Sequence, residues 1–218
     1  MSENELTETP DLKVVIQDKY WAHLMEHGKA PHSIYLFCQE LEITERAFYD
    51  HYSSFEAITS GFWAWLITDT QATLEADEDY QGYDTRGKLL AFLYTFFETA
   101  LGYRSRFLVA FPRREKALFC PTVREMKSAF DLSAQSLMEE VVAEGSALVP
   151  AQLQQQSYRG GWPVLLMLIE FWLQDTSKGF QDTDSLIEKT VKFGHEVTRF
   201  SAVDAAVDLG RFLLGRYK

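Results

Sequence analysis

Apolar residues recur at the spacing of helix turns along most of the chain, and the alternation typical of strands is nearly absent. The first apolar face is made by Leu12, Val15, Ile16, Tyr20 and Leu24. Thr9 and Pro10 precede it with the chemistry of a helix cap and a first helical residue, and Gly28 follows it as a natural stop. The pattern predicts an all-α protein of about nine or ten helices, the first beginning near Thr9.

Two short helices are predicted after Gly28. Ser33 caps a segment that ends near Glu40, and Thr44 caps another that ends near Tyr52. Only three residues separate the two segments, which is the spacing of a helix-turn-helix.

A longer helix follows, and an acidic stretch then divides the chain. Ser53 and Glu56 have the spacing of a capping box, and apolar positions continue to about Leu74. Residues 76–84 hold four acidic side chains and a glycine, as a boundary segment would. The predicted units are a helix-turn-helix domain over residues 9–53, a connecting helix over 54–76 and a C-terminal helical domain over 84–218.

Proline and glycine mark the helix boundaries in the C-terminal part. Helices are predicted over 85–103, over a short segment ending at Phe111, from Pro121 to Gly145, from Pro150 onward, and from near 182 to about 216. A proline inside a helix removes one backbone hydrogen bond and clashes with the preceding turn. Residues 160–163, Gly-Gly-Trp-Pro, therefore predict a kink or break in the helix that Pro150 opens.

Composition limits the class of protein. The 218 residues carry 21 basic and 32 acidic side chains, a net charge of −11, which excludes an overall basic footprint for nucleic acid. Two cysteines, Cys38 and Cys120, exclude a disulfide scaffold and fit a reducing cytoplasm. The longest strongly apolar stretch, 162–173, is 12 residues long, whereas about 20 are needed to cross a bilayer. We therefore expect a soluble, cytoplasmic protein without an integral membrane segment.

Several segments of the N-terminal part form a specific pattern: Glu26-His27-Gly28, Ser33 with Phe37-Cys38, Ile43-Thr44, and the run from Phe48 to Ile58. Through these residues, the stretch from Val14 to Leu66 resembles the N-terminal DNA-binding domain of TetR-family transcriptional repressors. The resemblance implies a three-helix module followed by a C-terminal bundle for ligand binding and dimerisation. It further implies a regulator that binds a DNA operator as a homodimer and responds to a small apolar ligand.

The resemblance also implies which side chains would face DNA. They are Lys29, Ser33, Thr44, Arg46, Ala47, Tyr49 and His51. The guanidinium of Arg46 suits bidentate recognition of guanine, and Tyr49 or His51 suits a phosphate contact.

The charge of this module departs from the family pattern. Glu42 stands where the family usually has glycine, Glu45 where it often has a basic residue, and Phe55 where it often has lysine. Across residues 11–60 there are eight acidic and four basic side chains, a net charge of −4. DNA affinity comes largely from cations at phosphates. An alternative therefore stays open, in which the fold has lost DNA binding and binds an apolar molecule or lipid of quinone or isoprenoid type, or a protein partner.

Aromatic residues of the C-terminal part are candidates for a ligand pocket. The candidate lining is Phe92, Phe96, Phe97, Phe107, Phe111, Trp162 and Glu170. Glu98 and Glu170 interrupt apolar faces, and each could hold the polar end of a ligand or pair with an arginine. Aromatic residues at helical spacing more often only pack, so an ordinary core is the competing interpretation.

A dimer seam is expected where the last two helices of TetR-like proteins pair. The candidate interface is Leu165, Ile169, Trp172, Leu173, Phe200, Val203 and Val207. The final residues, 211–218, interleave apolar and basic side chains, which also fits a membrane surface.

Other clusters suggest weaker alternatives. The cationic run Arg104, Arg106, Arg113, Arg114 and Lys116 could meet an anionic head group or an acidic membrane, or be a solvated face. His23 and His27 have the spacing of a zinc pair, but no distant third ligand stands out. No catalytic motif is found, so we predict no enzyme activity, no metal and no cofactor.

Overall fold

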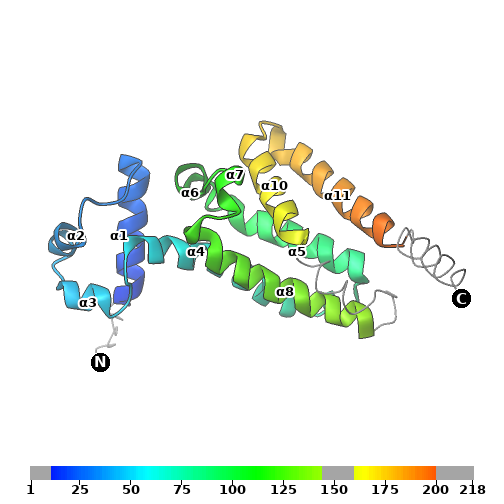
Figure 1. Ribbon diagram of the computed structural model, residues 1–218, viewed down its shortest axis with the longest axis horizontal. Coiled ribbons are helices and arrows are strands. Elements are labelled where there is room, and N and C mark those ends of the chain that lie inside the picture. The colour runs from blue at the N-terminus through cyan, green and yellow to red at the C-terminus, as the bar shows by residue number, and fades with distance from the viewer. Residues whose placement is uncertain (1–10, 144–159, 200–218) are drawn as a thin grey trace, which may run out of the picture.

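The computed structural model describes residues 11–143 and 160–199, and within those ranges every regular element is a helix. The predicted all-α class is confirmed. Figure 1 shows a small group of helices at one end of an elongated molecule and a larger group at the other, with α4 (Phe55–Glu75) running between them.

The small group consists of α1 (Leu12–His27), α2 (Ile34–Glu40) and α3 (Glu45–Tyr49). Asp11 caps α1, and Gly28 ends it in the left-handed conformation with φ 66°; the expected start at Thr9 and Pro10 lies outside the described residues. The predicted caps of the next two helices are confirmed. The Ser33 hydroxyl accepts a bond from the Leu36 N–H at 3.2 Å, and the Thr44 hydroxyl accepts one from the Ala47 N–H at 3.1 Å.

The predicted capping box at the start of α4 is wrong by one residue. Ser54, in extended backbone, accepts a hydrogen bond from the Ala57 N–H at 3.2 Å. Glu56 is then the second helical residue rather than the third, so its carboxylate is out of register for a reciprocal bond.

The larger group is built around α4. Its helices are α5 (Thr85–Leu101), α6 (Arg104–Ala110), α7 (Arg114–Ala117), α8 (Arg124–Ala143), α10 (Gly161–Gln174) and α11 (Gln181–Arg199), with short 3₁₀ turns at η1 (Tyr80–Gly82), η2 (Pro121–Val123) and η4 (Lys178–Phe180). α4 packs most extensively against α8 and α5, and α11 packs against α5.

Pro163 lies in the first turn of α10, because that helix begins at Gly161. The first turn has no intrahelical partner for its N–H groups, so a proline is tolerated there. The predicted helix starting at Pro150, the stop at Gly145 and the end of the last helix near 216 lie outside the described residues.

An aromatic core connects the two groups of helices. Trp63 of α4, fully buried, lies 4.7 Å from Phe107 of α6 and 6.0 Å from Trp21 of α1, between ring centroids. Phe107 in turn lies 5.4 Å from Trp172 of α10. The hydrophobic core therefore continues from the small group through α4 and α6 to α10.

Candidate nucleic-acid interface and ligand groove

The short helix α3 presents the side chains that the sequence assigned to DNA. Thr44, Arg46, Tyr49 and His51 are exposed. Phe48 is fully buried, with its ring 6.1 Å from Phe37 and 5.7 Å from Phe55, and so anchors α3 from beneath.

The other predicted DNA-facing residues differ in accessibility. Lys29 is exposed in the loop after α1, whereas Ser33 and Ala47 are half-buried. The hydroxyls of Ser33 and Thr44 both accept a cap bond from their own helix. Each hydroxyl keeps its own proton as a donor for a phosphate oxygen.

The charge on this surface is mixed. Glu42, Glu45 and Asp50 are exposed around the single cation of α3, Arg46. Glu42 also occupies the left-handed region with φ 55°, the position where glycine is favoured.

The cations of α1 are partly engaged elsewhere. Lys19 forms an ion pair with Glu40 of α2, with 3.7 Å between nitrogen and oxygen. Phosphate contact from this surface would depend mainly on Arg46 and Lys29.

Arg106 of α6 joins the small group of helices to the large one. Its guanidinium lies 4.8 Å from the Trp21 ring of α1, 4.7 Å from the Phe62 ring of α4 and 4.8 Å from Tyr103. Burial lowers the pKa of Arg106, an effect that Tyr103 and Asp18 oppose. The cationic run predicted as a surface is therefore partly interior.

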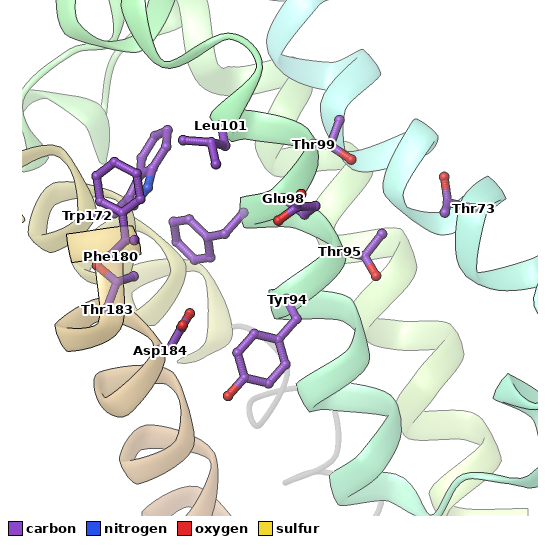
Figure 2. A pocket seen from close by; sticks show the side chains of 12 residues that line it. Thr73, Tyr94, Thr95, Glu98, Thr99, Leu101, Trp172, Phe180, Thr183 and Asp184 are labelled. Carbon is purple, nitrogen blue, oxygen red and sulfur yellow. The ribbon is translucent and has the colours of Figure 1, made fainter. Parts of the chain in front are cut away.

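A groove of about 580 Å³ extends along α5, from Thr73 of α4 on one side to the start of α11 on the other (Figure 2). We call it the α5–α11 groove. It is lined by Thr73, Tyr94, Thr95, Phe97, Glu98, Thr99, Leu101, Trp172, Gly179, Phe180, Thr183 and Asp184.

Carboxylates crowd one part of the α5–α11 groove. The pKa of Asp184 is raised by burial and by the negative charges of Asp175, Glu188 and Glu98. Tyr94 donates a hydrogen bond to Glu188 at 3.3 Å, and burial, followed by the charge of Glu188, raises the pKa of its phenol. Several carboxylates therefore lie close to the aromatic side chains that line the groove.

Arg104 of α6 contacts two of the residues that line this groove, Trp172 and Phe180. It donates hydrogen bonds to the backbone oxygens of Trp172 at 3.2 Å and Leu173 at 3.0 Å. Its guanidinium also lies 5.4 Å from the Trp172 ring and 5.0 Å from the Phe180 ring. The side chain is thereby fixed at the C-terminal end of α10, where a cation also suits the helix dipole.

Asp175 fixes the turn between α10 and α11. Its carboxylate accepts bonds from the Thr183 N–H at 2.9 Å, the Thr183 hydroxyl at 2.6 Å and the Ser177 N–H at 2.8 Å. Burial raises the pKa of Asp175, but these hydrogen bonds outweigh it and lower the value to about 2.

Most of the aromatic residues predicted to line a pocket are core. Phe92, Phe96, Phe97, Phe107 and Trp162 are at most 8% exposed, and Phe111 and Glu170 are half-buried. Only Phe97 of that set also lines the α5–α11 groove. Sequence reasoning missed Asp184 and Phe180, since nothing in their local pattern indicates that they lie opposite α5.

The predicted dimer residues divide in a similar way. Leu165, Ile169 and Trp172 are at most 2% exposed within one chain, and Leu173 is half-buried. Phe200, Val203 and Val207 lie outside the described residues. The homodimer stays a prediction; the apolar residues that α10 leaves exposed are Val164 and Phe171.

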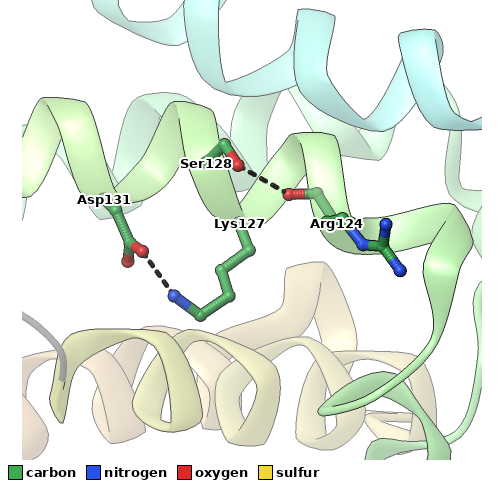
Figure 3. Close-up of polar contacts among 4 residues, drawn as sticks. All are labelled: Arg124, Lys127, Ser128 and Asp131. Carbon is green, nitrogen blue, oxygen red and sulfur yellow. Dashed lines mark hydrogen bonds and ion pairs between the residues drawn. The ribbon is translucent and has the colours of Figure 1, made fainter.

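The polar contacts near the start of α8 join residues of that helix to one another, whereas Ser133 further along donates a hydrogen bond to Gln71 of α4 at 2.5 Å. Lys127 forms an ion pair with Asp131 one turn further along α8, and the Ser128 hydroxyl donates to the Arg124 backbone oxygen at 3.1 Å (Figure 3).

The histidine pair predicted from its spacing is stacked, with 4.2 Å between the ring centroids of His23 and His27. Among the described residues, no three His, Cys, Asp or Glu side chains gather as metal ligands, and no helix is long and apolar enough to span a bilayer.

Comparison with known proteins identifies relatives for most of this architecture. A family model described as "Tetracyclin repressor-like, C-terminal domain" matches residues 88–213. The fold is similar to that of the fatty acid degradation regulator FadR from Bacillus halodurans, with a TM-score of 0.60 and 11% identity over 85% of this chain and 96% of that chain. It is also similar to a protein with unknown function from Rhodococcus sp. RHA1, with a TM-score of 0.52 and 14% identity over 89% of this chain and 99% of that chain. No curated protein matches the sequence.

Proposed function

The chain belongs to the family with a tetracycline-repressor-like C-terminal domain, and on that premise we propose that it is a ligand-responsive transcriptional regulator that binds DNA as a homodimer. C-terminal domains of this family usually mediate dimerisation and ligand binding, and its regulators are typically not enzymes. FadR, whose fold is similar, is itself a regulator of fatty acid degradation. TetR regulators are cytoplasmic, and the proposed function assigns this chain to the same compartment.

One observation carries the proposal. A helix anchored by buried Phe48 and capped by Thr44 exposes Arg46 and Tyr49 at the far end of the molecule from α11 (Figure 1). Such a helix can enter the major groove, where arginine reads guanine through paired hydrogen bonds. Two copies in a symmetric dimer would place two such helices about 34–36 Å apart, one turn of DNA.

Retention of genomic DNA fragments tests DNA binding directly. The purified protein is incubated with fragments of its source genome between roughly 50 and 200 mM salt, where phosphate contacts weaken steeply. The expected result is convergence of the retained fragments on one near-palindromic site.

Substitution of Arg46 tests the assignment of α3. Arg46→Ala should weaken binding to that site by roughly 5- to 100-fold, the effect of losing one bidentate base contact. Lys189→Ala is the matched control, because it also removes one exposed cation but lies on α11. Equal losses for both variants, or none for Arg46→Ala, would mean that α3 does not read the DNA.

The acidic surface around Arg46 favours a second candidate function. Glu42, Glu45 and Asp50 oppose phosphate contact, so the family fold would here bind an apolar small molecule, a lipid or a protein partner without binding DNA. Two findings together would support this candidate: no fragment retained at roughly 50 mM salt, and a stoichiometric isoprenoid or acyl lipid in an organic extract of the protein. Sequence-specific retention would exclude it.

A further inference from the structure

We propose that the α5–α11 groove binds an organic cation with an apolar tail. In the regulator proposed above, this cation would be the ligand that controls DNA binding. That regulatory role rests on the proposed function. The binding itself is a property of the groove and is tested without DNA.

The size and the walls of the groove fit a small organic molecule. Its volume of about 580 Å³ lies within the range of small-molecule sites. Aromatic rings from three elements line it: the half-buried Tyr94 of α5 and Phe180 of η4, and beside them Phe97 of α5 and Trp172 of α10, which are at most 7% exposed. Such rings bind an apolar tail and also attract a cation to their faces.

The charge of the groove selects the sign of the ligand. Glu98 from α5 and Asp184 from α11 lie on opposite sides of the space between these helices (Figure 2). The residues that line the groove include no lysine, arginine or histidine. Glu188 and Asp175 add negative charge close to Asp184, so a cation entering here relieves repulsion that the protein carries without it.

The protein's own Arg104 shows that the same ring wall accepts a cation. Its guanidinium lies against the rings of Trp172 and Phe180. Because Arg104 holds this end, a ligand would place its positive group at the Tyr94, Glu98 and Asp184 end and its tail toward Phe180. An anionic ligand, such as a fatty acid, would meet two carboxylates instead.

Calorimetric titration with three probes tests the sign of the ligand. The probes share a phenylbutyl tail: 4-phenylbutyltrimethylammonium is cationic, 4-phenylbutanol neutral and 5-phenylpentanoate anionic. The purified full chain should bind the cation about tenfold more tightly than either of the others, a preference on the scale of one or two partly exposed charge contacts. Equal binding of the alcohol would overturn the proposal, because it would reduce the groove to an apolar surface.

Paired substitutions locate the site. Glu98→Gln with Asp184→Asn should lower affinity for the cation about tenfold and leave the alcohol unaffected. Glu78→Gln with Glu125→Gln is the control, since it removes the same two charges from exposed positions outside the groove. Circular dichroism establishes that each variant folds, and Glu98→Gln alone, a change at an exposed side chain, serves if the double variant does not. Unchanged affinity in a folded groove variant would overturn the proposal.

The outcomes for the groove and for the regulator are separable. Cation binding with no DNA retention leaves the groove assignment standing and removes its regulatory role. DNA retention with no preference for the cation removes the groove assignment and leaves the regulator proposal standing.

Discussion

At the scale of single residues, Glu42 combines an unfavourable backbone with an unfavourable charge. It forms the turn between α2 and α3 with φ 55°, and its N–H donates to the Gln39 oxygen at 3.2 Å. A side chain in this conformation costs about 1 kcal/mol relative to glycine. Glu42→Gly should therefore raise the free energy of unfolding by about 0.5–1 kcal/mol in chemical denaturation.

Glu42→Gln separates the two effects of that substitution. It removes the same charge but keeps the Cβ atom that the left-handed backbone disfavours. We expect no gain in stability from glutamine, and a gain equal to that of glycine would assign the effect to charge rather than to backbone strain.

Asp175 makes the stability of the α10–α11 turn depend on pH. Its pKa in the folded chain is about 2, below the value of about 3.9 in an unfolded chain. The stabilising contribution of the carboxylate is therefore fully present above about pH 4 and is lost as the pH falls through 2. Asp175→Asn should lower the melting temperature at neutral pH and flatten its dependence on pH between these limits.

Thermal melts at several pH values measure this effect. Asp79→Asn is the control, because Asp79 is exposed and its carboxylate makes no capping hydrogen bond to the 3₁₀ turn that follows it. A variant at Asp175 that keeps the wild-type acid dependence would show that the carboxylate does not hold the turn.

At the scale of elements, α6 connects the residues beside the groove to α1 and α4. Arg104 reaches the end of α10, whereas Arg106, two residues on, lies against Trp21 of α1 and Phe62 of α4. A shift of α6 caused by a ligand would therefore act on both partners at once.

Arg106→Ala should loosen the contact between α1 and α6. The substitution removes the contacts of a half-buried guanidinium with aromatic rings, which should lower the free energy of unfolding by about 1–2 kcal/mol. Hydrogen exchange of the α1 amides should speed up in the variant. Arg113→Ala removes an exposed arginine from the same cationic run and should change neither quantity; an equal response of both variants would contradict a specific role for Arg106.

The sequence predicted those elements whose chemistry is local. The caps Ser33 and Thr44 and the stop at Gly28 depend on residues within one helical turn, so their types alone indicate them. The shift from Ser53 to Ser54 shows the usual limit, since adjacent serines are equally good caps.

The α5–α11 groove could not be predicted from local sequence patterns, because it depends on which helix faces pack against each other. Tyr94 and Asp184 are far apart in sequence, and their proximity follows from α11 packing on α5. Trp172 shows the same limit. α10 is apolar nearly all round, so periodicity does not tell a face that packs inside the chain from one that meets a partner.

At the scale of the whole molecule, the charge balance limits how DNA can be bound. Apart from the ion-paired Lys19, the basic side chains of the small group of helices and its loops are Lys13, Lys29 and Arg46, which sets an upper limit on its phosphate contacts. A dimer would then make at most six such contacts, and each contributes about −0.9 to the slope of log affinity against log salt. We expect a slope no steeper than about −5 in a salt titration with the retained operator.

Neutralising the acids beside Arg46 tests whether local charge or net charge sets the affinity. Glu45→Gln with Asp50→Asn should strengthen operator binding about tenfold at low salt, because both carboxylates are exposed within four residues of Arg46, the proposed base-reading side chain. The pair Glu78→Gln and Glu125→Gln changes the net charge of −11 by the same amount but away from α3. Screening confines charge effects to about 10 Å at 0.1 M salt, so this control should bind DNA as the wild type does. If both pairs strengthen binding equally, long-range repulsion governs the affinity, and the acidic residues around α3 carry no special role in recognition.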